Sequence, residues 1–313
     1  MSVIGVDVGG TKIAAGRLTR GMIVAGPVVI PTPAGGPAII EAIAGLVADL
    51  SAGSPDGIRG LGVGLPATID AVTGRVVHSV HTGMDDFDAA ARLVERVGMP
   101  VFLDNDANLA ALAEHRLGAG RGHDHVVMLT LGTGIGGGVI IEGRVFRGGR
   151  GHGAELGHIS VDGNGPPCQG GCPGRGCIEA LCSGSALTRA FCAFADANRA
   201  SALGRLHQSG MLDSESGLAL AQEGDADARA VLATAGEWLG VAVASLANTF
   251  DPDVILIGGG VSAAGELLLG PARTVYHARA LPPTRRAPLL VAGLGPDAGM
   301  VGAALMAREG VGA

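Results

Sequence analysis

One histidine and three cysteines lie close together in the chain: His158, Cys168, Cys172 and Cys177. Histidine nitrogen and cysteine sulfur are the atoms that a structural zinc ion takes as ligands in a closed tetrahedron. The segment between them is rich in Gly and Pro, which suits a knuckle of tight turns because Gly reaches backbone angles that are closed to other residues. We therefore predict that a zinc ion organises this loop.

Two other interpretations of the cysteines compete with zinc. All five cysteines lie between positions 168 and 192. Disulfides would need an oxidising compartment, but the chain starts with a strand-like segment over 3–7 and not with a signal peptide. Unpaired core cysteines are common, yet cores are rarely so rich in Gly and Pro. Cys182 and Cys192 fall in a stretch expected to be helical, where we interpret them as apolar packing residues.

Two carboxylates, Glu155 and Glu179, flank the proposed zinc ligands. A solvated surface position is ordinary for Glu, but a place beside a metal loop favours a role in a pocket. Carboxylates accept hydrogen bonds from vicinal hydroxyls, so a polyol or a sugar fits. His158 can bind zinc through one ring nitrogen and offer the other to a ligand.

Three glycine-rich turns are candidate phosphate sites. Glycine lets backbone N–H groups approach phosphate oxygens, and a threonine hydroxyl adds a donor. Asp7, at a strand end, could hold Mg²⁺ through water because this ion prefers oxygen ligands. One such turn alone would more often be an ordinary hairpin, and none is a Walker loop, but three together favour a nucleotide. The proposed ATP and Mg²⁺ residues are Asp7, Gly9, Gly10, Thr11, Lys12, Gly132, Thr133, Gly134, Gly258, Gly259 and Gly260.

A polar cluster at Asp104, Asn105, Asp106 and Asn108 lies between an expected strand and an expected helix. A helix cap is the plain interpretation, because Asp and Asn satisfy free N–H groups there. One cap needs one such residue, whereas here four polar residues occur within five. A carboxylate at a strand end can accept a proton from a substrate hydroxyl. We favour Asp106 over Asp104 as this base.

The elements that must position these residues follow from apolar periodicity and turn residues. We expect strands at 3–7, 12–18, 23–29, 61–66, 101–103, 126–131, 139–141, 253–257 and 289–292. We expect helices at 38–50, 89–97, 109–117, 183–200, 215–223, 225–248 and 299–308. The strand–turn–strand plan of 3–18 recurs at 126–141.

Two α/β halves that each open with a hairpin around a Gly/Thr turn describe an actin-like (ribonuclease H-like) ATPase fold. We expect a small N-terminal domain at 1–111 and a large C-terminal domain at 112–295 that carries the zinc loop. The last helix, in 296–313, should pack back on the N-terminal domain. The nucleotide would lie in the cleft between the two domains.

Composition excludes some classes of protein. The 313 residues are 47% hydrophobic with a net charge of −7, and no basic cluster marks a nucleic-acid surface. No apolar run free of charge reaches the roughly 18 residues of a membrane-spanning helix. With no targeting segment, we expect a cytoplasmic protein, assembled as a homodimer or a higher homo-oligomer, that binds neither nucleic acid nor membranes.

The chain resembles the ROK family of sugar kinases, particularly its bacterial glucokinases, over nearly its whole length. The resemblance rests on the motifs at 5–12, 105–108, 130–138, 155–158, 172–179, 257–261 and 298–304. It implies ATP with Mg²⁺, a structural zinc, and phosphoryl transfer to a sugar hydroxyl. Asp106 would be the base, and Asn105, Glu155, His158 and Glu179, with Asp106, would bind the sugar.

Two positions depart from the family pattern. Family members usually space the first two zinc cysteines as Cys-x-Cys, whereas Cys168 and Cys172 here have three residues between them. Family glucokinases usually carry an Asn and a Trp in the sugar-side segment, which at 78–87 has no Asn and offers Phe87 in place of the Trp. We expect the zinc site to survive with altered loop geometry.

The most favoured activity is therefore ATP-dependent phosphorylation of glucose to glucose 6-phosphate. An N-acetylhexosamine, either N-acetylglucosamine or N-acetylmannosamine, is the alternative substrate, and polyphosphate is an alternative donor. A ROK-type sugar-sensing repressor is the alternative from another class. Such repressors add an N-terminal helix-turn-helix, whereas this chain begins at its first strand, so we favour the kinase.

Overall fold

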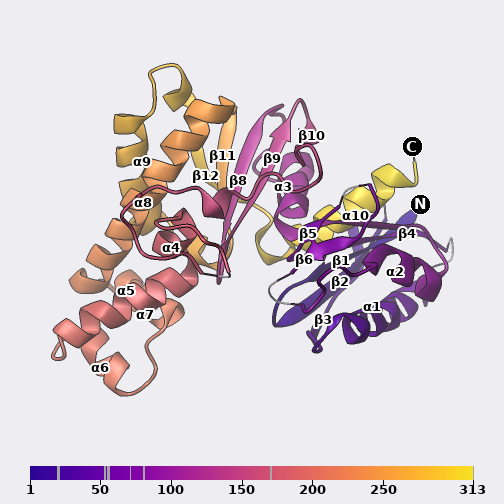
Figure 1. Ribbon diagram of the computed structural model, residues 1–313, viewed down its shortest axis with the longest axis horizontal. Helices are drawn as coiled ribbons and strands as arrows, with labels where there is room; N and C mark the ends of the chain where they lie inside the picture. The colour runs from indigo at the N-terminus through magenta and orange to yellow at the C-terminus, as the bar shows by residue number, and fades with distance from the viewer. Residues whose placement is uncertain are drawn as a thin grey trace. The chain divides into compact units, whose positions relative to one another are not determined.

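The computed structural model describes residues 1–19, 22–52, 54, 57–70, 72–79, 82–169 and 171–312. It is an α/β structure in which the chain forms two compact units (Figure 1). Unit 1 comprises Met1–Asp124, Gly138–Ala154 and Gly293–Ala313, and unit 2 comprises His125–Gly137 and Glu155–Ala292. The chain therefore passes from one unit to the other four times.

Unit 1 is built on a five-stranded sheet. Its strand order is β3-β2-β1-β4-β7. The bounds are β1 Ser2–Val8, β2 Lys12–Thr19, β3 Met22–Pro31, β4 Ile58–Leu65 and β7 Val101–Asn105. The first three strands are antiparallel, whereas β4 and β7 run parallel to β1. The carboxyl ends of β1, β4 and β7 therefore meet at one edge of the sheet, with Asp7 opposite Gly64 and Gly64 opposite Asp104.

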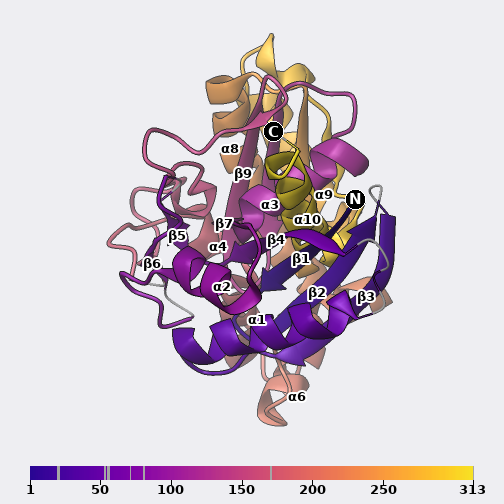
Figure 2. The same ribbon diagram turned by 90° about the vertical axis from the view of Figure 1, so that its right-hand side faces the viewer.

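Helices cover the sheet of unit 1 on both faces (Figures 1 and 2). They are α1 Gly36–Ser51, α2 Ala89–Val97, α3 Asp106–Leu117 and α10 Ala298–Gly310. Side chains alternate between the two faces of a strand. Ile4 and Val6 accordingly join the core cluster that includes Ile39 and Ile43 of α1. Gly62 presents the other face, where an added Cβ would overlap the Ala303 carbonyl of α10, so glycine permits this close approach.

The second sheet has strand order β10-β9-β8-β11-β12. Its strands are β8 Val126–Leu131, β9 Ile135–Ile141, β10 Arg144–Val145, β11 Val254–Gly258 and β12 Leu289–Val291. The division between the units falls within β9. β11 pairs in parallel with both β8 and β12, and the core strands β8 and β11 are apolar and almost fully buried, as parallel strands covered on both faces require.

The helices of unit 2 pack against one another. They are α4 Ile178–Cys182, α5 Gly184–Ala197, α6 Ala202–Gln208, α7 Ser214–Glu223, α8 Ala226–Phe250 and α9 Glu266–Arg279. By length and composition alone α8 could cross a membrane, but 56% of its most apolar window is buried inside the protein. It packs closely on α9, so we interpret α8 as a core helix of the unit.

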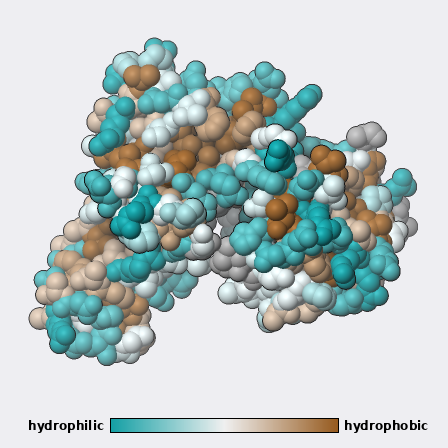
Figure 3. All heavy atoms as spheres, in the orientation of Figure 1, coloured by the Kyte–Doolittle hydropathy of each residue, from teal (hydrophilic) through white to brown (hydrophobic). Residues whose placement is uncertain are grey.

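Short elements complete the structure. They are β5 Thr68–Ile69, β6 Val76–His78, and the 3-10 turns Leu156–His158, Gly260–Ala264, Thr284–Arg286 and Gly295–Asp297. On the face drawn in Figure 3, apolar side chains occur in small groups separated by hydrophilic ones, which is ordinary for a folded protein surface.

The predicted strands are present, and four details of the prediction are wrong. β9 begins at Ile135 and not after the glycines, because Gly138 lies in the strand and faces Ala107 and Ala111 of α3 without a side chain to obstruct them. The predicted helix at 183–200 is α5, which ends at Ala197, and the sequence does not predict α6, which follows it. Helix α3 begins at Asp106 and not at 109. Helix α9 was not predicted, and it contains Pro271, which normally argues against a helix.

Candidate active site

Asp7 lies near the end of β1, between the buried Val6 and Val8, in a closely packed place in unit 1. An added Cβ at Gly299 of α10 would lie 2.6 Å from its carboxylate, so only glycine lets the two elements meet here. Burial raises the pKa of Asp7 to about 6, and this effect outweighs the opposite effect of the Lys12 ammonium, which lowers the pKa. The predicted hairpin follows, with the Gly9 N–H donating to the Lys12 carbonyl at 2.8 Å. A cation beside Asp7 would favour its charged form.

Gly10, Thr11 and Lys12 lie at the exposed end of this hairpin. Their exposure leaves the tip of the turn accessible to a phosphate-bearing ligand. Asp7 and this turn are the residues of unit 1 for which phosphate binding is predicted, and that role stays a prediction.

Asp104 is a structural residue. Its carboxylate is buried and forms an ion pair with Arg147 at 2.6 Å. It also accepts hydrogen bonds from the Asn108 side chain at 3.0 Å and from the Asn105 N–H at 2.8 Å. These contacts occupy both carboxylate oxygens, which leaves Asp104 unsuited to take a proton from a substrate.

Asp106 is the first residue of α3 and is half-buried. Its Cα lies 3.5 Å from the point that a Cβ on Gly64 would occupy, and the Asp7 carboxylate lies 3.3 Å from that same point. Asp7 and Asp106 therefore border Gly64 at the carboxyl edge of the sheet. This placement puts the proposed base and the proposed Mg²⁺ residue at one end of unit 1.

Asn105 caps helix α3. Its Oδ1 accepts hydrogen bonds from the Ala107 N–H at 2.9 Å and from the Asn108 N–H at 3.2 Å. Its Nδ2 donates to the Ala67 carbonyl at 3.4 Å. The helix-cap interpretation thus holds for Asn105, and only its amide nitrogen has a hydrogen left for a sugar oxygen.

The predicted zinc ligands come together. One ligand atom from each of His158, Cys168, Cys172 and Cys177 lies within 4.8 Å of the others, and the Cys168 sulfur is 3.5 Å from His158 Nδ1. The sulfurs of a tetrahedral zinc site, with bonds of about 2.3 Å, lie roughly 3.8 Å apart. Burial, and then the Cys177 and Cys172 thiols, raise the pKa of Cys168 to about 12, and a cation bound among these sulfurs would favour their thiolate forms. The donor set fits zinc.

The widened spacing between Cys168 and Cys172 does not remove either sulfur from this cluster. All five cysteines are free thiols, so the disulfide interpretation is not supported. Cys182 is fully buried in α4 and stands apart from the cluster, consistent with the predicted packing role.

Glu179 makes a hydrogen bond that the sequence does not predict. It is buried in α4, and its Oε2 accepts a hydrogen bond from the Ile135 N–H at 2.7 Å. An added Cβ at Gly134 would overlap the same carboxylate. Glu179 therefore braces the turn between β8 and β9, and its Oε1, 4.0 Å from the Cys168 sulfur, is the oxygen left for a ligand. Glu155, in contrast, is exposed and precedes the turn that carries His158.

The two glycine turns of unit 2 meet because β8 and β11 are parallel neighbours. Thr130 pairs with Gly258, so Gly132–Gly134 and Gly258–Gly260 follow these strands at the same edge. Gly259 has a φ of 81° and lies so close to Leu131 that a Cβ would overlap it. Gly132 is fixed in turn by the Gly184 N–H of α5, which donates to its carbonyl at 2.7 Å.

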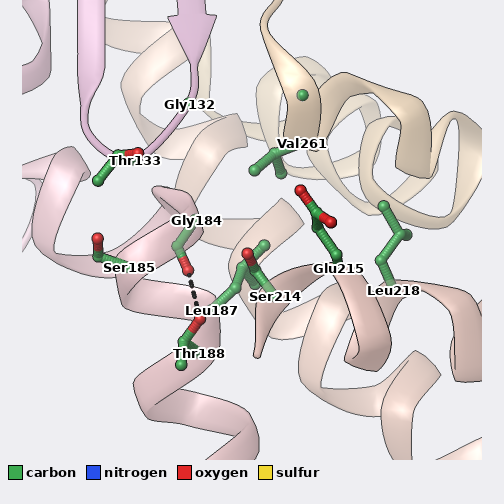
Figure 4. Close-up of a pocket in the computed structure, with 11 residues that line it drawn as sticks. Gly132, Thr133, Gly184, Ser185, Leu187, Thr188, Ser214, Glu215, Leu218 and Val261 are labelled. Carbon is green, nitrogen blue, oxygen red and sulfur yellow. Dashed lines mark hydrogen bonds between the residues drawn. The ribbon is translucent and has the colours of Figure 1, made fainter. Parts of the chain in front are cut away.

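A cavity of about 360 Å³ opens beside these turns. Apolar walls come from Leu187, Leu218 and Val261, and Figure 4 shows the Glu215 carboxylate on the Val261 side of the space. The lining residues of α5 and α7 have no signal in the sequence, because they belong to no motif and only the fold brings them together. They are Gly184, Ser185, Leu187, Thr188, Ser214, Glu215 and Leu218.

Residues 3–310 match the ROK family. The chain belongs to this family. It is 37% identical to a glucokinase of Halalkalibacterium halodurans over 98% of this chain and 94% of that protein. It is also 37% identical to a glucokinase of Thermotoga maritima over 100% of this chain and 99% of that protein. Its fold matches the crystal structure of a ROK family glucokinase from Streptomyces griseus in complex with glucose and AMPPNP, with a TM-score of 0.87 and 38% identity over 99% of this chain and 100% of that one.

These matches confirm the predicted family and its actin-like α/β fold. In this ROK chain, Phe87 packs against Gly36 at the start of α1, and the Arg92 guanidinium lies 4.8 Å from its ring centroid. Phe87 is thus partly buried in the core of unit 1. Positions 80 and 81 of the sugar-side segment lie outside the described residues.

Proposed function

We propose that this ROK chain is an ATP-dependent hexose kinase that converts glucose to glucose 6-phosphate. The similarity to glucokinases over nearly the whole chain supports the reaction class. The observation that carries the proposal at residue level is the contrast between the two aspartates. Asp104 is ion-paired with Arg147, whereas Asp106, whose Oδ1 accepts the Ala107 N–H at 2.8 Å, borders Gly64 together with Asp7.

In the proposed reaction, Asp106 accepts the proton of the sugar hydroxyl. The oxygen of that hydroxyl attacks the γ-phosphorus of ATP, and the bond between the γ-phosphorus and the leaving ADP breaks. Catalysis in this class consists mainly of positioning and of charge neutralisation around the transferring phosphoryl group. Backbone N–H groups of Gly132–Gly134 and the hairpin at Lys12 would supply donors. Asp7 would hold Mg²⁺, which neutralises phosphate charge when bound, and the cavity of unit 2 would take the nucleoside.

The sugar would be read by Asn105, Glu155, His158 and Glu179. The contacts above leave each of Asn105 and Glu179 one polar atom for this task. A zinc ion would be held by His158 and the three cysteines, and its contribution would be structural. A pocket that hydrogen-bonds specific hydroxyls rejects analogues that lack them, because its own polar groups are then unpaired.

A direct test offers the purified protein glucose, N-acetylglucosamine and N-acetylmannosamine, each with ATP and with polyphosphate. Phosphorus NMR then identifies the product and the phosphorylated position. We expect glucose 6-phosphate from ATP, and none from the Asp106→Asn protein under the same conditions. Preference for an N-acetylhexosamine would reassign the substrate, and failure to phosphorylate any hexose would refute the proposal.

A further inference from the structure

The loop between Cys168 and Cys172 carries a side chain that reaches the nucleotide turn. We propose that Gln169 is a positioning residue that couples the metal loop to Thr133 and so tunes nucleotide binding. The inference rests on the proposed function in one respect: it takes the Gly132–Gly134 turn as part of the ATP site.

Gln169 lies in a hydrogen-bond network in which the chemistry of the side chains determines which atoms donate and which accept. Its Oε1 accepts a hydrogen bond from Arg189 Nη1 at 3.0 Å. A guanidinium has donors only, so the amide oxygen must face Arg189 and the amide nitrogen must face the other side. There Nε2 donates to the Thr133 carbonyl at 3.4 Å and to the Ser183 hydroxyl at 3.3 Å.

The partners of Gln169 are themselves anchored. Ser183 is fully buried and caps α5 by accepting the Ala186 N–H at 3.1 Å. Arg189 donates a second hydrogen bond, from Nη2, to the Ala180 carbonyl of α4 at 3.2 Å. Gln169 is thus held between two helices of unit 2, and its remaining contact is with the turn that lines the cavity.

Two links therefore join the metal loop and its flanking helix to one turn. Glu179 accepts the Ile135 N–H on one side of Gly134, and Gln169 donates to Thr133 on the other side. Gln169 is one of the three residues between Cys168 and Cys172, so the second link comes from the loop itself. A change in loop shape moves the Gln169 donor away from the turn, and the metal and nucleotide sites become coupled.

A second hydrogen-bond donor to the Thr133 carbonyl limits how much the loss of Gln169 can weaken nucleotide binding. The Ser185 N–H also donates to the Thr133 carbonyl, at 3.3 Å, so loss of Gln169 leaves the turn partly held. One hydrogen bond of ordinary net strength corresponds to roughly 3- to 10-fold in affinity. Gln169→Glu is the sharper variant, because the carboxylate keeps the pairing with Arg189 but sets an acceptor against the Thr133 carbonyl.

Asn164→Ala is the matched control. Asn164 is exposed in the same loop between His158 and Cys168, and its side chain is not part of this network. Gln169→Ala removes all three contacts of the side chain, with Arg189, Thr133 and Ser183. All variants should keep their zinc, because none changes a ligand.

Isothermal calorimetry with AMPPNP and, separately, with glucose tests the proposal, with zinc content measured on the same samples. We expect Gln169→Glu and Gln169→Ala to bind AMPPNP about 3- to 10-fold more weakly, with glucose affinity and zinc content as in the Asn164→Ala and unmodified proteins. Unchanged AMPPNP affinity in Gln169→Glu overturns the proposal, as does an equal loss of glucose affinity. If the unmodified protein binds no AMPPNP at all, the proposed ATP site itself is wrong.

Discussion

Asp104 and Asp106 are two positions apart, yet their surroundings assign them different roles. The Asp104 carboxylate is buried and bound by Arg147, whereas Asp106 begins a helix at the carboxyl edge of the sheet. An Asp→Asn change keeps the size of either side chain and removes its charge. The same substitution at the two positions therefore separates a catalytic from a structural role.

We predict that Asp106→Asn lowers kcat by at least ~10²-fold, the lower end of general-base effects, with little change in glucose affinity. Asp104→Asn should instead lower the free energy of unfolding by about 1–3 kcal/mol, because Arg147 loses its charged partner. Steady-state kinetics, glucose calorimetry and urea unfolding on both variants check the pair. More than a tenth of the original kcat in Asp106→Asn would remove this residue from the mechanism.

Asp7 should give the activity an acidic limb. Its pKa is raised by burial to about 6, so the carboxylate is ionised above that pH and protonated below it. Only the ionised form can hold Mg²⁺. The value of kcat/KM for MgATP reports ionisations of the free enzyme. We therefore expect kcat/KM to fall as the pH drops through about 6. A pH profile that stays flat between pH values on both sides of about 6 contradicts this role.

The raised pKa of Asp7 also affects the stability of the fold. Activity should fall as the pH drops, whereas stability should rise. The folded pKa exceeds the unfolded value of about 4, so the folded state binds more protons in between and stability falls as pH rises through this window. At neutral pH the cost is on the order of 2–3 kcal/mol. We predict that ligand-free Asp7→Asn melts at a higher temperature than the unmodified protein at pH ~7.5, with a smaller difference at pH ~4.5. Thermal melts at both pH values measure it.

At the scale of elements, the metal loop has almost no regular secondary structure to hold it. Apart from a 3-10 turn at Leu156–His158 and isolated bridges, its described part is turns, and helix α4 begins directly after Cys177. A bound metal supplies folding free energy to such a loop. The loop contains Gln169 and is followed by Glu179, so its order matters beyond the metal site.

We predict about one zinc per chain. Cys168→Ser should lose most of the zinc and lower the melting temperature, because one of four ligands is removed. Cys182→Ser is the matched control, since Cys182 is a buried packing cysteine outside the cluster. Plasma emission spectrometry and thermal melts on both proteins decide the ligand set. Zinc loss in Cys182→Ser with retention in Cys168→Ser would show that the assigned set is wrong.

At the scale of the whole molecule, the two ends of the chain complete one core. Helix α10, near the C-terminus, packs on β1, β4 and α3, which lie in the first part of the sequence. Its small residues make this possible: at Gly302 an added Cβ would overlap the Leu109 carbonyl of α3. The stability of unit 1 therefore depends on close packing between segments far apart in the sequence.

We predict that Gly302→Ala lowers the free energy of unfolding by about 1–3 kcal/mol through overpacking. Gly45→Ala is the matched control, because Gly45 is an exposed position inside α1 with no atom within 4 Å of the added Cβ. At position 45, alanine should raise the free energy of unfolding by roughly 0.5–1 kcal/mol, since alanine favours the helix more than glycine does. Chemical unfolding of the two variants should give shifts of opposite sign, and equal shifts would contradict the packing argument.

The sequence by itself determined the chemistry that is carried by local patterns. Apolar periodicity located every strand of the two five-stranded sheets except β10, and the cysteine and histidine spacing predicted the four clustered side chains. The motifs also predicted the ROK family. These features need only near neighbours, because a turn, a strand or a short loop depends mostly on the residues within it.

The tertiary structure alone decided which polar groups are already engaged. Arg147 lies far along the chain from Asp104, and Ile135 lies far from Glu179, so neither contact has a local signal. The same holds for the cavity walls from α5 and α7, and for Gln169 against Thr133. Hydrogen bonds and packing between distant segments depend on how the whole chain folds, and no single motif encodes them.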